Sequence, residues 1–139
     1  MAAPVSKGQV SDPERVMMAE KVARDVVNAD PTILGLLVLD RKHGYDALTV
    51  ARSPSLPPED YASPALVEKF AIAATVVWGA SEQAAQLMGR QEFIVGAFKG
   101  QMVLLIDLKE YDMLLAMRLT RSSNAEHLYL KIADLLGIG

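Results

Sequence analysis

Hydrophobic residues in the middle of the chain recur at helical spacing over a wide arc. The segment from Pro64 to Met88 predicts one helix of about 25 residues, with Ser63 as its N-cap and Gly89 as its stop. On a helical wheel two apolar stripes lie side by side and span roughly 200°, about twice the usual arc of a surface helix. The first stripe comprises Leu66, Phe70, Ala73, Val77, Ala80, Ala84 and Leu87. The second comprises Val67, Ala71, Ala74, Trp78, Ser81 and Ala85.

The second stripe needs a covering surface of its own, because a helix on one small domain buries one face. Its small residues would let another helix approach closely, and that helix could belong to a second copy or to the same chain. Trp78 lies mid-stripe, where it could fill a partner's hollow; burying such a side chain contributes on the order of 2–3 kcal/mol. The remaining side of the helix is polar and comprises Glu68, Thr75, Glu82, Gln83 and Gln86.

The residues before this helix predict a tail, a helix and a hairpin. Residues 1–10 show no periodicity and are expected to form a loose tail, whereas residues 11–139 form a single domain. Ser11 and Glu14 have capping-box spacing, so a helix should begin there and run to about Asn28. The continuous apolar run 33–40 and the alternating run 47–52 predict two paired strands. The proline-rich segment 53–63 predicts no regular structure.

Three apolar runs after Gly89 predict an antiparallel meander. They span residues 92–98, 102–108 and 113–119 and are joined by short polar connections. We expect the almost wholly apolar run 102–108 to be the central strand and the run 92–98 to be an exposed edge strand. Ser123 and Glu126 repeat the capping-box spacing before a last helix, which should stop at Gly137.

The element order αββαβββα predicts an α+β fold with a five-stranded antiparallel sheet between two helical layers, α/β/α. If the first and last helices share one face, the long helix must cover the other face alone. A helix about 10 Å wide leaves most of a five-stranded face bare. A second copy of the long helix would cover it, so we expect a homodimer.

Composition narrows the class of protein. The chain has 139 residues, of which 51% are hydrophobic and 22% charged, in keeping with apolar surface buried between chains. The net charge of −3 has no basic block behind it, which argues against nucleic-acid binding. The absence of cysteine excludes disulfides and thiolate metal sites and agrees with a cytoplasmic location. Neither a leader peptide nor membrane insertion is indicated.

Candidate catalytic side chains carry weak signals. No phosphate-binding glycine motif occurs. His127 could be combined with Ser123 and Asp112, but capping explains the serine and turn chemistry explains the aspartate. Asp107, Glu110 and Asp112 cluster at a tight turn, where solvated carboxylates are common. We therefore predict no catalytic, cofactor-binding or metal site, and no enzymatic activity.

The element order, with its long middle helix, resembles the Roadblock/LC7 family, including its prokaryotic MglB-like members. The resemblance covers about residues 11–136. The stretch ILGLLVLDRKHGYDALTVARS resembles the family's first hairpin, and FIVGAFKGQMVLLIDLKEYDMLLAMRLT followed by SSNAEHLYLKIADLL resembles its meander and closing helix. The fold is related in outline to profilin and longin domains.

The resemblance implies a non-catalytic regulator or scaffold that dimerises through the long helix and the third strand and binds a Ras-like small GTPase. The implied dimer surface comprises Val67, Ala71, Ala74, Trp78, Ser81, Ala85, Phe93, Val95 and Ala97. The implied partner-binding platform comprises Glu68, Thr75, Glu82 and Gln86. A small-molecule-sensing domain and a plain assembly subunit are the alternatives, and pairing with a paralogue is open. The kind of GTPase regulation and the role of the 53–63 loop are open as well.

Overall fold

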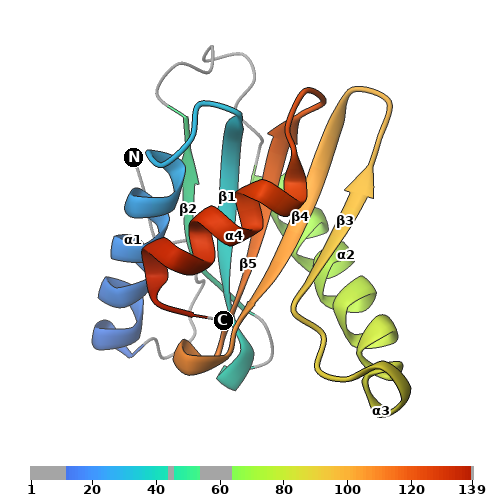
Figure 1. Cartoon of the computed structure of the whole chain (residues 1–139). Helices are drawn as coiled ribbons and strands as arrows, with labels where there is room; N and C mark the ends of the chain where they lie inside the picture. Colours follow the sequence, from blue (N-terminus) through green and yellow to red (C-terminus); the bar gives the residue numbers. More distant parts are fainter. Residues whose placement is uncertain (1–11, 44–45, 54–63, 139) are drawn as a thin grey trace.

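The computed structural model describes residues 12–43, 46–53 and 64–138, shown in Figure 1. Its helices are α1 (Pro13–Val27), α2 (Pro64–Glu82), α3 (Ala85–Met88) and α4 (Ala125–Leu136). Its strands are β1 (Ile33–Asp40), β2 (Asp46–Arg52), β3 (Phe93–Ala97), β4 (Gln101–Leu108) and β5 (Met113–Thr120). Short 3-10 helices follow β1 (Arg41–His43) and β4 (Lys109–Tyr111). The predicted order of helices and strands is confirmed, except that α3 follows α2 as a separate short helix.

The five strands form one antiparallel sheet in the order β2-β1-β5-β4-β3. The predicted hairpin is β1–β2, the predicted meander is β3–β4–β5, and β3 is an edge strand as expected. The prediction that residues 102–108 form the central strand is wrong, because β5 pairs with β1 and so occupies the centre. Apolar content alone did not separate β4 from β5, since both strands are buried on two faces.

Two apolar cores lie on the two faces of the sheet, as the predicted three layers require. The first core joins α1 and α4 to one face. Its larger members include Val22, Val26, Leu36, Val38, Ile106, Leu115, Met117, Leu128 and Ile132. The second core joins α2 alone to the other face and comprises Leu37, Leu39, Ala71, Ala74, Trp78, Leu105, Leu114 and Ala116. Figure 1 shows α1 and α4 in front of the sheet and α2 behind it.

Both predicted capping boxes are displaced by one residue. Asp12 caps α1 by accepting a hydrogen bond from the Glu14 N–H at 2.9 Å, and Ser11 lies outside the described residues. Asn124 rather than Ser123 caps α4, accepting from the His127 N–H at 3.0 Å. Aspartate and asparagine are good N-caps, as serine is. Residue type alone therefore did not decide between Ser11 and Asp12, or between Ser123 and Asn124.

The predicted single helix over residues 64–88 is wrong. Helix α2 ends at Glu82, and the short α3 follows after two turn residues. The Ala84 N–H donates to the Ser81 carbonyl at 3.0 Å, which tightens the backbone at the break. Gly89 has a φ of 96°, which favours glycine at the predicted stop. Ser63, the predicted cap, lies outside the described residues.

In the described part of the chain, no helix combines the length and the apolar content that a transmembrane helix needs.

Candidate functional site

The inner face of α2 is packed against the chain's own sheet. Ala71, Ala74 and Trp78 are buried in the second core, with Trp78 fully inaccessible. The prediction that these three residues face a second chain is therefore wrong. The alanines let the helix approach the sheet, and the indole fills the space between α2 and the sheet. The remaining members of the second predicted stripe are half-buried, namely Val67, Ser81 and Ala85.

The outer face of α2 carries the uncovered apolar residues. We define it by Leu66, Ile72, Ala73, Val76, Val77 and Ala80, all of which are exposed. Ile72 and Val76 are 56% and 62% accessible, and residues 70–81 contain no charged side chain. Four of these residues belong to the first predicted stripe. That stripe faces outward, whereas the second predicted stripe faces the sheet. A contiguous apolar face of this kind marks an interaction site more often than scattered exposed residues do.

The edge strand β3 adjoins this outer face. Among the described strands β3 pairs only with β4. Phe98, just beyond the strand, is 63% accessible, and its ring lies 3.6 Å from the point where a Cβ on Gly96 would stand. Gly96 and Ile94 are two residues apart on the strand and so share one face of the sheet, and Ile94 packs into the second core. The Phe98 ring therefore extends the apolar surface on the α2 side. The two surfaces together form our candidate interaction site.

The other predicted β3 residues point to the α4 side of the sheet. Phe93 is half-buried, and its ring stacks on Tyr129 of α4 with centroids 4.4 Å apart. Val95 and Ala97 are exposed on the same side. The backbone of these residues can pair with the edge strand of a partner, but their side chains do not contribute to the outer face of α2.

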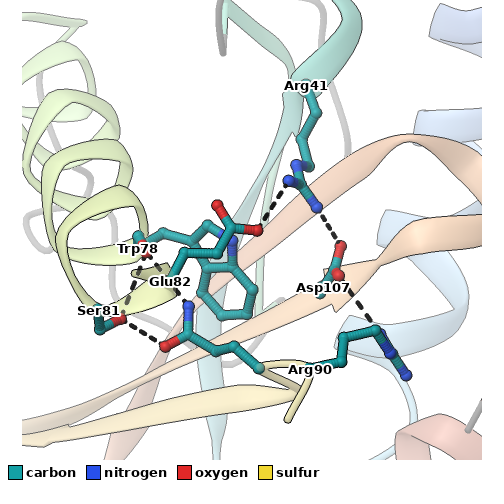
Figure 2. A network of polar contacts seen from close by, with 7 residues as sticks. Arg41, Trp78, Ser81, Glu82, Arg90 and Asp107 are labelled. Carbon is teal, nitrogen blue, oxygen red and sulfur yellow. Dashed lines mark hydrogen bonds and ion pairs between the residues drawn. The ribbon is translucent and has the colours of Figure 1, made fainter. Parts of the chain in front are cut away.

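An ion-pair network, drawn in Figure 2, ties the C-terminal end of α2 to the sheet. Arg41, directly after β1, donates to Asp107 of β4 at 2.6 Å and to Glu82 of α2 at 3.1 Å. Arg90 donates to the second Asp107 oxygen at 3.4 Å. Gln91 donates to the Trp78 carbonyl at 3.2 Å, which holds the segment after α3 against α2. This network therefore holds the end of α2 against β4 and against the segment that precedes β3.

Three of the predicted partner-binding residues lie on α2 and the fourth lies on α3. Glu68 is exposed on α2, whereas the Thr75 hydroxyl turns back and donates to the Ala71 carbonyl at 2.8 Å. Glu82 is engaged by Arg41, and Gln86 lies on α3 beyond the break. Their role in binding a partner stays a prediction.

The sequence interpretation missed three kinds of feature. Ile72 and Val76 belonged to neither stripe, although their apolar character and spacing could have identified them as a continuation of the first. Arg41 and Asp107 lie 66 positions apart, and nothing in the sequence pairs them. The orphaned Trp78 Nε1 is buried without a hydrogen-bond partner in the structure of the described residues, a feature that no sequence pattern reveals.

The weak catalytic candidates are dispersed. His127 is exposed in the first turn of α4, and the Ser123 hydroxyl lies 3.3 Å from the Thr120 hydroxyl. Asp112 is an exposed turn residue with a φ of 56°. Within residues 12–43, 46–53 and 64–138 no three His, Asp or Glu side chains are grouped as metal ligands.

Comparison with known proteins gives matches at the level of structure. No family model matches the sequence. No characterised protein sequence matches it at a significant level either.

Several solved structures share the arrangement described above. An MglB structure with a tetrameric arrangement has a TM-score of 0.69 at 18% identity, covering 94% of this chain and 93% of that one. The gliding protein MglB from Thermus thermophilus has a TM-score of 0.64 at 15% identity, covering 94% and 96%. A Roadblock/LC7 domain from Streptomyces avermitilis has a TM-score of 0.61 at 15% identity, covering 84% and 90%. With its α1/α4 layer, its antiparallel sheet and its single α2 layer, this chain has the Roadblock/LC7 fold.

Proposed function

We propose that this chain is a non-catalytic cytoplasmic regulator or scaffold that self-associates and binds a Ras-like small GTPase. The observation that carries the proposal is the outer face of α2, an apolar surface without charge between residues 70 and 81, beside the open edge of β3. The fold shared with MglB proteins, one of them in a tetrameric arrangement, supports self-association. The GTPase partner rests on the resemblance to MglB-like Roadblock proteins.

The proposed self-association surface differs from the predicted one in its helix residues. Ala71, Ala74 and Trp78 fill the chain's own core. The helix residues that we propose for the surface are therefore Ile72, Val76 and Val77. Two copies that pair β3 edge to edge would place both α2 helices on the same face of one continuous sheet. Between residues 70 and 81 the outer faces lack charge, so this part of the two helices could pack without desolvating an ion.

The first test is the solution mass of wild type and of Val76→Glu by light scattering. We expect a dimer or larger assembly for the wild type and a folded monomer for the variant, because a carboxylate in an apolar seam is costly to bury. Met17→Glu is the matched control, since Met17 is equally exposed but lies on α1, on the other side of the sheet. A Val76→Glu protein with wild-type mass would contradict this surface.

The second test concerns the GTPase. We expect a Ras-like GTPase from the same genome to bind the wild type in calorimetry, with an affinity that depends on bound GDP or a GTP analogue. Met17→Glu should bind as the wild type does. Intact self-association without binding to any such GTPase would favour the plain assembly subunit.

A further inference from the structure

A second apolar surface lies on the opposite side of the sheet from α2. We define the β3 strip as Val95 and Ala97 of β3, Met102 of β4 and Leu130 of α4. Ala97 pairs with Met102, and Val95 pairs with Leu104, which belongs to the first core. Val95 is 41% and Leu130 59% accessible. In Figure 1 α4 crosses in front of the inner strands and leaves the front of β3 open.

The flanks of α4 identify which of its residues border the strip. Tyr129 stacks on Phe93 and so marks the flank facing β3. Lys131 bonds Asp30 at 3.3 Å and marks the opposite flank, near the α1–β1 connection. At about 100° per residue, Glu126 and Leu130 continue the Tyr129 flank outward. The strip therefore has an apolar wall at Leu130 and a carboxylate at Glu126.

The rim of the strip includes two exposed carboxylates. Glu92, at the start of β3, and Glu126 are both exposed. Burial, and after it the negative charge of Glu92, raises the pKa of Tyr129. Asp107 and Glu110 act in the same direction and Arg90 opposes them. Arg90 lies 3.4 Å from Asp107 and 4.0 Å from Glu92, so it offsets part of the Glu92 charge. Glu126 and the exposed Glu92 carboxylate favour a partner with positive charge at this end of the strip over one with negative charge.

We propose that the β3 strip is a docking surface for a short, basic amphipathic segment of a partner protein. Apolar side chains of that segment lie on Val95, Ala97 and Leu130, and its lysines or arginines pair with Glu92 and Glu126. The strip is complete in one chain, so the proposal does not require self-association. Edge-to-edge pairing of β3 would occupy the strand's backbone while leaving this face uncovered, and would bring two strips together.

The test uses the full chain, isotope-labelled for NMR, and a synthetic helical peptide of about 14 leucines and lysines. We expect its addition at low salt to shift the resonances of Val95, Ala97, Met102 and Leu130. A scrambled peptide of the same composition and a glutamate-for-lysine version should cause no saturable shifts. Shifts confined to α2, or equal binding of the acidic peptide, would overturn the proposal.

Two double variants distinguish binding at the strip from a general effect of charge. Glu126→Lys combined with Leu130→Ser should weaken the lysine–leucine peptide by about tenfold or more. The control is Glu14→Lys combined with Met17→Ser on α1. It likewise changes an acidic residue of the first turn and an exposed apolar residue. This control should bind the peptide as the wild type does. Equal loss in both double variants, or no loss in the first, contradicts docking at the strip.

Discussion

Asp107 is a carboxylate whose burial depends on two arginines of unequal importance. Arg41 bonds it at 2.6 Å and is largely shielded from solvent, whereas Arg90 bonds it at 3.4 Å and is 43% accessible. Removing the partner of a buried charge leaves the desolvation penalty uncompensated. The two arginines should therefore differ in what their loss costs the fold.

We expect Arg41→Gln to lower the free energy of unfolding by about 2–4 kcal/mol, because Asp107 and Glu82 both lose their closest cation. Arg90→Gln is the control and should cost no more than about 1 kcal/mol. Urea denaturation followed by circular dichroism measures both. Equal losses in the two variants would show that the network does not depend on Arg41.

Asp30 predicts how acid affects the fold. Burial would raise the pKa of Asp30, but hydrogen bonds from the Thr32 hydroxyl and N–H, at 2.6 and 2.9 Å, favour its carboxylate. Together with Lys131 they lower this pKa below its ordinary value of 3.8. The carboxylate therefore stabilises the fold at pH values above 3.8, and that contribution disappears as the pH falls through the lower folded pKa.

In a pH series of urea denaturation, the wild type should exceed Asp30→Asn in stability above about pH 5, and the difference should shrink on further acidification. Asp134→Asn, at an exposed position of α4, should follow the wild-type curve. Parallel curves for wild type and Asp30→Asn would contradict the assignment.

At the scale of elements, β3 is defined by the two edges of its backbone. The Phe98 N–H donates to the Gln101 carbonyl and the Glu92 carbonyl accepts from the Asp107 N–H, so even-numbered residues of β3 bond β4. By antiparallel alternation the main-chain groups of odd-numbered residues such as Val95 and Ala97 point to the open edge. A proline can therefore block one edge without breaking the other.

We expect Ala97→Pro to keep the circular dichroism spectrum of the wild type while lowering its solution mass, because it removes an N–H from the open edge. Gly96→Pro removes an N–H from the β4 ladder and should destabilise the fold by about 3 kcal/mol or more. Light scattering with parallel thermal melts measures both. If Ala97→Pro retains the wild-type mass, self-association does not use the β3 edge.

At the scale of the whole molecule, the two faces of the sheet are unequally covered. Two helices pack on one face and α2 alone packs on the other. Association that buries the outer face of α2 adds its free energy to that of folding, so stability should depend on protein concentration. The surface lacks charge between residues 70 and 81, so salt should have only a weak effect on the free energy of association.

We expect the Tm of the wild type to rise between about 1 and 100 μM protein and to change little between low and high salt. The Tm of Val76→Glu should be independent of concentration. A wild-type Tm that does not change on dilution would indicate that folding and association are uncoupled.

The sequence by itself determined the elements and their layering. Alternating and continuous apolar runs identified all five strands, and the run 92–98 was recognised as an edge. Counting helices against sheet faces predicted that α2 would cover one face alone. These conclusions follow from periodicity and turn chemistry, which act over a few neighbouring residues.

Only the tertiary structure decided which stripe of α2 faces inward. The wheel ranked both stripes as apolar, and the fit of Trp78 between α2 and the sheet selected the one with Ala71 and Ala74. The same holds for β5 at the sheet centre and for the pairing of Arg41 with Asp107. Each of these depends on contacts between residues far apart in the chain, which the periodicity of neighbouring residues does not encode.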